Sequence, residues 1–233
     1  MNWIDCGISS YIYYGKFYRI DIWSDVICPW CYLGKRRLER AMERLDWAGE
    51  IEIHWRAYLL DPTATAEPQD LESAINRKYG PGAFSGMKKR LGALGEAEGI
   101  AYNFDTAVRV STLDAHRLLA WAWDEAGAAG QGALKEGLLR AYFEDGANVA
   151  DAATLGRLAG EAGLDVAKAG EIIAAGAYRD VVLADLEGAM DREITGVPAF
   201  VVEDRLLIPG AQDTDTFVDV LNRVRVRFAA KGF

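Results

Sequence analysis

Apolar and polar positions in the first part of the chain predict a strand, a helix and a second strand. Residues 17–23 form an aromatic and β-branched run that is typical of a buried strand. Residues 28–45 place apolar side chains, among them Leu33 and Leu38, near helical spacing. Residues 51–57 alternate apolar and polar side chains, which is the period of a half-buried strand. A strand, a helix and a strand in this order open an α/β fold.

The middle of the chain, from about residue 70 to residue 193, repeats apolar side chains at helical spacing almost throughout. Residues 126–132 are rich in Ala and Gly and are interpreted as a loop that joins two helices. Strand character returns in residues 199–203 and 206–208, which predict an antiparallel hairpin, and a final helix follows. The outer elements are therefore βαβ and ββα, and a long helical segment separates them.

The predicted fold class is α/β, in the order βαβ…ββα, with a large all-helical domain inserted. We expect residues 17–66 and 194–233 to form the α/β domain and residues 67–193 to form the inserted helical domain. Residues 1–16 are an N-terminal extension of uncertain structure. An extra strand or arm, a disordered tail and a start codon placed too far upstream are the alternatives for this extension.

Composition and charge exclude several classes of partner. Hydrophobic residues make up 51% of the 233 positions, which is enough for a substantial core. No apolar run reaches the length of about 18 residues that a membrane span needs, so no membrane partner is expected. The net charge of −9 argues against nucleic acid as the main partner. Asp5 interrupts the first residues and no basic stretch precedes it, so the expected location is the cytoplasm.

The tetrapeptide Cys28-Pro29-Trp30-Cys31 places two thiols one helical turn apart, directly after a predicted strand. Proline lacks an N–H and suits the first position of a helix, so Cys28 is expected at the helix mouth. The free backbone N–H groups and the helix dipole are expected to lower the pKa of the Cys28 thiol there. Cys31 lies close enough to form a disulfide with Cys28. The tetrapeptide predicts a dithiol redox centre.

Three other interpretations of the two cysteines are weaker. A zinc site needs four ligands, whereas the chain offers only Cys6 as a further thiol, with His54 and His116 far apart in sequence, so no metal is expected. Two inert buried cysteines would not require a proline at the first helical position. A purely structural disulfide is unusual in a chain without secretory features. Cys6 itself is interpreted as a bystander rather than a third redox thiol.

Two longer motifs carry a family resemblance. They are the segments Ser24–Arg37 and Thr195–Phe200, and weaker support comes from Asp114–Leu118 and Gly210–Gln212. On these residues the chain resembles the DsbA-like thioredoxin-fold proteins, most closely their FrnE-type branch, from Tyr18 to about Arg225. Kappa-class glutathione transferases and 2-hydroxychromene-2-carboxylate isomerases share this architecture. The resemblance implies a thioredoxin-like fold with an inserted helical domain.

The resemblance also implies roles for individual residues. Pro198 is expected to be a cis proline that faces the dithiol, and the Val197 backbone to pair with a bound substrate strand. The expected substrate-binding residues are Pro29, Trp30, Val197, Pro198 and Gln212, and glutathione is an expected cosubstrate near Val197 and Gln212.

His116 recurs in this family beside the active-site cleft, yet it lies on an apolar helix without a partner adjacent in sequence. It is interpreted as a structural histidine rather than as an acid or base.

The functional hypothesis is a cytoplasmic thiol–disulfide oxidoreductase in which Cys28 attacks a substrate disulfide and Cys31 resolves the mixed disulfide. No cofactor is expected beyond the redox-active Cys28–Cys31 disulfide, and relatives of this architecture make a homodimer plausible. Trp30 replaces the His of the secreted DsbA oxidants, so the direction of electron flow stays open. The alternatives are a glutathione-dependent transferase or isomerase, whose relatives generally carry Ser at the first thiol position, and a redox-linked chaperone that binds peptides in the helical cleft.

Overall fold

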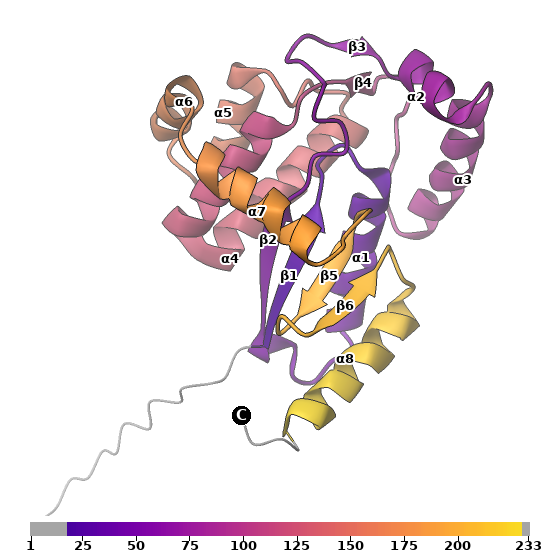
Figure 1. The fold of residues 1–233 in the computed structure, drawn as a ribbon, viewed down its shortest axis with the longest axis vertical. Helices are drawn as coiled ribbons and strands as arrows, with labels where there is room; N and C mark the ends of the chain where they lie inside the picture. Colours follow the sequence, from indigo (N-terminus) through magenta and orange to yellow (C-terminus); the bar gives the residue numbers. More distant parts are fainter. Residues whose placement is uncertain (1–17, 230–233) are drawn as a thin grey trace, which may run out of the picture.

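The computed structural model describes residues 18–229, so the predictions for residues 1–16 and for Cys6 lie outside the described residues (Figure 1). The strands are β1 (Tyr18–Ser24), β2 (Ile51–Ala57), β3 (Gln69–Asp70), β4 (Val108–Arg109), β5 (Ala199–Val202) and β6 (Leu206–Pro209). The helices are α1 (Pro29–Met42), α2 (Leu71–Tyr79), α3 (Ala83–Ala97), α4 (Leu113–Phe143), α5 (Ala152–Glu161), α6 (Val166–Ala175), α7 (Arg179–Asp191) and α8 (Thr214–Ala229), with a 3₁₀ turn at Ala48–Glu50.

The four longer strands form one mixed sheet in the order β2-β1-β5-β6. β1 pairs in parallel with β2 and antiparallel with β5, and β5 pairs antiparallel with β6. At the centre of this sheet Ile22 lies between Trp55 of β2 and Phe200 of β5. The parallel pair needs the α1 crossover, because a tight turn joins only antiparallel strands. The order βαβ…ββα with a helical insertion is confirmed.

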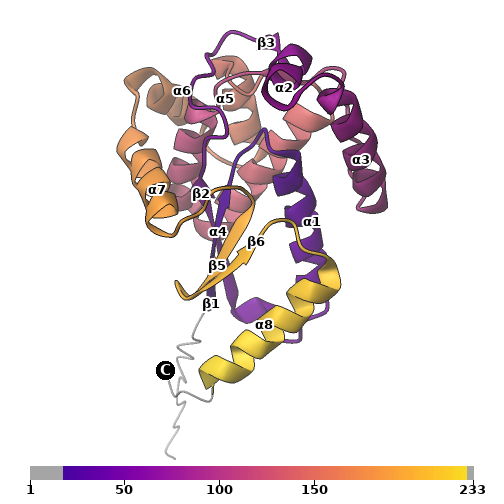
Figure 2. The same ribbon diagram turned by 45° about the vertical axis from the view of Figure 1, so that its right-hand side comes forward.

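Helices α1 and α8 cover one face of the sheet, as both ribbon views show (Figures 1 and 2). The core on this face brings together side chains from the sheet, from α1 and from α8: Ile20, Ile22, Leu38, Phe200, Ile208, Phe217 and Leu221. Phe200 and Phe217 meet edge to face, with ring centroids 4.8 Å apart. Helix α1 thus lies between the sheet and α8 in one shared core.

The opposite face of the sheet packs against α7 and α4 (Figure 2). Because side chains alternate along a strand, Trp23, Ala199 and Val201 point to this face and contact Ala189 of α7. The indole N–H of Trp23 donates to the Asp185 carbonyl at 2.8 Å. Helix α7 therefore closes the side of the sheet that α1 and α8 leave open.

At the free edge of the sheet, a side chain of α4 supplies hydrogen-bond partners to the backbone of β2. Trp55 donates its N–H to Gln131 Oε1 at 2.8 Å, and Gln131 Nε2 donates to the Trp55 carbonyl at 3.0 Å. The Gln131 amide is fully buried and continues the ladder in place of a further strand. This pair fixes α4 against β2.

Helix α4 replaces a predicted loop. Two helices do meet within residues 126–132, as expected, but the expected loop is wrong: they join across a kink at Gly127 alone, at φ 61° and ψ −157°. The helix resumes directly, and Gly130 and Gln131 are buried. The packing of Gln131 on β2 outweighs the low helix propensity of the Gly-rich stretch.

Smaller differences occur elsewhere. α1 ends at Met42, three residues before the expected end at residue 45, and the two-residue pair of β3 and β4 was not predicted. Among residues 18–229, none of the helices combines the length and apolar character that a membrane span requires.

Candidate active site

The two thiols lie at the beginning of α1, as the sequence predicts. Cys28 is the N-cap residue with extended backbone (φ −91°, ψ 112°), and Pro29 is the first helical residue. The Cys28 carbonyl accepts the first helical bond, from the Cys31 N–H at 3.0 Å. Both cysteines are free thiols and both are buried, with 3% of Cys28 and none of Cys31 exposed. Cys28 is therefore the thiol closer to solvent.

The loop before β5 faces these thiols at the same end of the sheet, because the last residues of β1 pair with the first residues of β5. The Val197–Pro198 peptide bond is cis, the conformation that the resemblance implies. The Cys28 thiol donates to the Val197 carbonyl, with 3.6 Å between Sγ and O. The ladder between β1 and β5 ends at Trp23 and Ala199, so the Val197 backbone lies beyond it. The structure brings Cys28, Val197 and Pro198 together.

Gly34 allows this close approach. A Cβ atom built on Gly34 would lie 2.9 Å from Cγ of Pro198 and 3.3 Å from Cζ of Phe200. No side chain fits at that position without displacing the proline ring or the ring beneath it. Gly34 is a site residue that sequence reasoning missed, although a glycine inside a helix one turn after the dithiol was the available signal.

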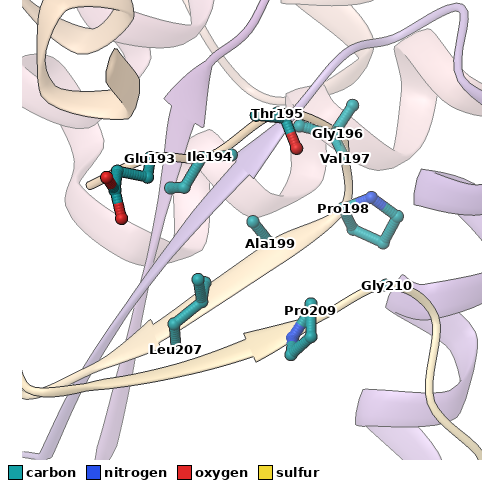
Figure 3. Close-up of a pocket in the computed structure, with 10 residues that line it drawn as sticks. All are labelled: Glu193, Ile194, Thr195, Gly196, Val197, Pro198, Ala199, Leu207, Pro209 and Gly210. Atoms are coloured by element: carbon teal, nitrogen blue, oxygen red, sulfur yellow. The ribbon is translucent and has the colours of Figure 1, made fainter. Parts of the chain in front are cut away.

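A pocket of about 350 Å³ lies beside the cis proline (Figure 3). Figure 3 shows Val197 and Pro198 at the start of β5, with Leu207 and Pro209 on the neighbouring strand. Thr195 closes the pocket on the loop side. An extended chain that pairs with the Val197 backbone would place a side chain next to this pocket.

A buried carboxylate and imidazole lie beneath the dithiol. Asp25 is fully buried, and its Oδ1 is 3.2 Å from Nε2 of His116, which is 2% exposed. Asp25 Oδ2 accepts from the Leu60 N–H at 2.8 Å. Burial favours the neutral carboxyl, but the hydrogen bond and charge of His116 hold the pKa of Asp25 below its ordinary value. His116 has the partner that its sequence neighbours do not supply, and its structural role stays a prediction.

A buried lysine from α4 also lies beneath the thiols. Lys135 is fully buried, and its Nζ has no hydrogen-bond partner among residues 18–229. The ammonium lies over the Trp55 ring, 5.4 Å from the ring centroid. Burial lowers the pKa of Lys135 to about 8, although the negative charges of Cys31 and Asp25 act in the opposite direction. No pattern near position 135 in the sequence predicts a titratable group at the dithiol.

The pKa values of the two thiols shift in opposite directions. Interaction with Cys31 and burial raise the pKa of Cys28 well above its ordinary value. Burial also acts to raise the pKa of Cys31, but the Cys28 thiol and the charge of Lys135 outweigh burial and lower it. The prediction of a low pKa at Cys28 is therefore wrong for the dithiol. The Cys28 side chain makes no capping hydrogen bond to α1, and its proton points to the Val197 carbonyl.

Trp30 lies on the side of the dithiol that faces α3. Its ring is half-buried, and the guanidinium carbon of Arg90 is 5.1 Å from the ring centroid. The hydroxyl of Tyr102 donates to the Pro29 carbonyl at 2.5 Å. The first turn of α1 is thus held from this side by Tyr102, while Trp30 stays open to solvent at one edge.

Gln212 is not joined to the dithiol by any contact that the structure gives for residues 18–229. Its Nε2 donates to the Pro209 carbonyl at 2.5 Å, and its backbone N–H donates to the Gly210 carbonyl at 3.0 Å. The neighbouring Ala211 carbonyl accepts from Arg37 of α1 at 2.9 Å. These bonds hold the loop after β6 in place, and a contact of Gln212 with substrate stays a prediction.

The sheet order, the two thiols at a helix mouth and the facing cis proline define a class, the thioredoxin-like dithiol proteins. The DSBA-like thioredoxin domain family matches residues 19–222, and the chain belongs to this family. A probable DsbA oxidoreductase from Streptomyces coelicolor is 35% identical, with a TM-score of 0.81, over 88% of this chain and 89% of that one.

Two further comparisons are more distant. An uncharacterized protein of Bacillus subtilis (strain 168), YwbO, is 27% identical over 201 residues, which are 85% of this chain and 93% of that protein. The cytosolic disulfide reductase DsbM from Pseudomonas aeruginosa, in a structure with GSH, is 19% identical with a TM-score of 0.63, over 90% of this chain and 99% of that one. The DsbM comparison shows a shared fold.

Proposed function

We propose that the protein is a thiol–disulfide oxidoreductase whose redox centre is the Cys28–Cys31 pair. The observation that carries the proposal is the position of Cys28 at the mouth of α1, with its Sγ 3.6 Å from the carbonyl of Val197 beside the cis Pro198. A second thiol one turn further along the helix supplies the partner that resolves a mixed disulfide. An intact pair favours this chemistry over that of a transferase, which needs no resolving thiol.

The first step is attack by Cys28. Cys31 is the sulfur with the lower pKa, so Cys28 becomes a thiolate when its proton passes to Cys31. The Cys28 thiolate forms a bond with one sulfur of the substrate disulfide, and the other sulfur leaves as a thiolate that takes up a proton. Cys28 is the attacking thiol because Cys31 is wholly enclosed.

The second step is resolution by Cys31. Cys31 loses its proton and attacks Cys28 Sγ, the bond between Cys28 and the substrate breaks, and the substrate leaves as a thiol. Two electrons have then passed from the dithiol to the substrate, and the Cys28–Cys31 disulfide remains. The charge of Lys135 stabilises the Cys31 thiolate in this step. The reverse sequence oxidises a substrate dithiol.

The proposal includes an extended peptide substrate, paired with the Val197 backbone and contacting Pro29, Trp30 and Pro198. It also includes glutathione as a cosubstrate and the cytoplasm as the setting, in line with the fold shared with the glutathione-bound cytosolic disulfide reductase. The chemistry runs on the two sulfurs and requires no further cofactor. The reduction potential relative to glutathione decides which direction operates.

Trapping of the mixed disulfide tests the proposal. We expect Cys31→Ser to accumulate a covalent adduct with a peptide disulfide through Cys28, and Cys28→Ser to form none. Both variants should lose insulin-reduction turnover, whereas Cys6→Ser, the matched control, should keep it. Full turnover in Cys28→Ser would refute the mechanism. A titration against glutathione buffers, read by tryptophan fluorescence, then gives the reduction potential.

A further inference from the structure

The helical pair α2 and α3 carries a concentration of positive charge that the proposed chemistry does not use. Between residues 71 and 97 there are five cationic side chains and two acidic ones, a net charge of +3 in a chain whose total is −9. We call this segment the basic hairpin. Four of its cations are exposed: Arg77, Lys78, Lys89 and Arg90.

These four cations have no carboxylate within ion-pair distance among residues 18–229. The fifth, Lys88, pairs with Asp105 and is thereby neutralised. Some exposed arginines elsewhere have acidic partners, as Arg157 has in Glu161. Unpaired cations grouped on one element create a local positive potential that attracts anions.

The basic hairpin adjoins the dithiol through one contact. Arg90 lies over the ring of Trp30, which stands between the two cysteines in sequence, at 5.1 Å from the ring centroid. The carbonyl oxygen of Val197 lies 3.6 Å from the sulfur of Cys28, and Trp30 follows Cys28 by two residues. A chain that pairs with Val197 and crosses Cys28 therefore arrives at Trp30 and Arg90.

We propose that the basic hairpin binds the carboxylates of an acidic peptide segment whose cysteine reacts with Cys28. This inference rests on the proposed oxidoreductase function and names its substrate class. Arg90 binds the carboxylate nearest the reacting sulfur, and the cations beyond it bind those further along the peptide.

The spread of the cations favours a peptide over a small disulfide. Arg90 lies seven positions after Ala83, the first residue of α3, so about 10 Å of helix lies between the hairpin turn and Arg90, and the cations of α2 lie before that turn. An extended peptide covers that distance with about three residues. Acidic residues three to five positions from the cysteine would reach the whole hairpin, whereas the carboxylates of glutathione disulfide lie close to its sulfurs.

Peptide disulfides that differ only in charge test the inference. The probes are three peptides with Glu, Gln or Lys at positions three to five from the cysteine, and glutathione disulfide is the fourth substrate. We expect kcat/KM to decrease from the Glu peptide to the Gln peptide to the Lys peptide. At low salt, kcat/KM for the Glu peptide should be roughly five times that for the Gln peptide. Near 0.5 M salt, where the screening length falls to about 4 Å, the two values should be equal.

Variants assign the effect to the hairpin. Lys89→Gln/Arg90→Gln should bring the Glu to Gln ratio to about one. Arg223→Gln/Arg227→Gln changes two exposed arginines of α8, at the opposite end of the molecule. It removes the same two positive charges and should keep the ratio (Figure 1).

The outcomes separate this inference from the proposed function. If the Gln peptide is reduced but Glu gives no advantage, the inference fails and the oxidoreductase function stands. If salt and the hairpin variant change only the reduction of glutathione disulfide, or if Arg223→Gln/Arg227→Gln removes the preference equally, the inference also fails. If none of the four disulfides is reduced, the proposed function itself fails.

Discussion

Gly34 of α1 and Pro198 of the loop before β5 are in such close contact that a single added methyl group would collide with the proline ring. The distance from an ideal Cβ on Gly34 to Cγ of Pro198 is 2.9 Å. The same contact holds the cis-proline loop over the first turns of α1, where the dithiol lies. Helix α1 and this loop are therefore packed as one unit, and we expect a substitution in either of them to shift the positions of the two thiols.

Substitution of this glycine should destabilise the protein. We expect Gly34→Ala to lower the free energy of unfolding by about 1–3 kcal/mol, because the new methyl group overpacks a closed site. Insulin-reduction turnover should fall as well. Gly170→Ala in α6 is the matched control, since a Cβ there meets nothing within 4 Å. It should raise the free energy of unfolding by about 0.5–1 kcal/mol. Equal stability changes in both variants would contradict this account.

Removal of the buried lysine should change the ionisation of the dithiol. The charge of Lys135 lowers the pKa of Cys31, so Lys135→Met should move the first thiolate ionisation to higher pH. Thiolate absorbance near 240 nm, followed against pH, measures the shift. Lys135→Arg keeps the charge and should retain most of the effect if the guanidinium fits. An unchanged thiolate curve in Lys135→Met would show that the lysine does not act on the thiols.

The same lysine should make stability depend on pH in the alkaline range. Burial lowers the pKa of Lys135 from 10.5 to about 8 in the folded chain, so the unfolded chain binds more protons between these values. The cost of the buried charge is fully present below about pH 8 and disappears as pH rises toward 10.5. Wild type should therefore be less stable than Lys135→Met at pH 7, by about 3 kcal/mol, and the difference should shrink from pH 8 to pH 10.

Urea unfolding of the two proteins at several pH values measures this difference. Because Lys135→Met also shifts the thiolate ionisation, both proteins carry Cys28→Ser and Cys31→Ser in this comparison, so the thiols do not enter the difference. A difference that grows with pH would contradict the burial of a charged lysine.

The amide of Gln131 should contribute to the attachment of α4 to β2. Gln131→Leu removes the partners of the Trp55 N–H and carbonyl, and we expect a loss of about 2–4 kcal/mol in the free energy of unfolding. Hydrogen exchange at the Trp55 amide should accelerate. Gln69→Leu, on an exposed strand, should change stability by no more than about 0.5 kcal/mol. A similarly small effect at Gln131 would mean that the paired amide contributes little.

The sequence predicted those parts of the fold that depend on local patterns. Residues 51–57 alternate regularly and form β2, and the Asp204-Arg205 turn separates two apolar runs that become β5 and β6. The position of Cys28 at a helix mouth follows from Pro29 alone. These features need no knowledge of distant contacts.

Features that depend on distant contacts were missed. Lys135 reaches the dithiol because α4 packs on β2, and nothing near position 135 signals this packing. The same packing converts the Gly-rich stretch around Gly130 into helix. The helix end alone does not predict the pKa of Cys28, because the interaction with Cys31 and burial have the larger effect on that pKa.

The pairing of β1 with β5 has a consequence for how the chain folds. Cys28 and Val197 meet although 169 positions separate them in sequence, and all the helices from α1 to α7 lie between them in the chain. Contacts of such sequence separation form slowly, because a long loop must close first. During synthesis the ribosome releases the two cysteines well before Pro198. Burial of the thiols is thus a late event in folding, and the nascent chain carries an accessible dithiol until its final strands are made.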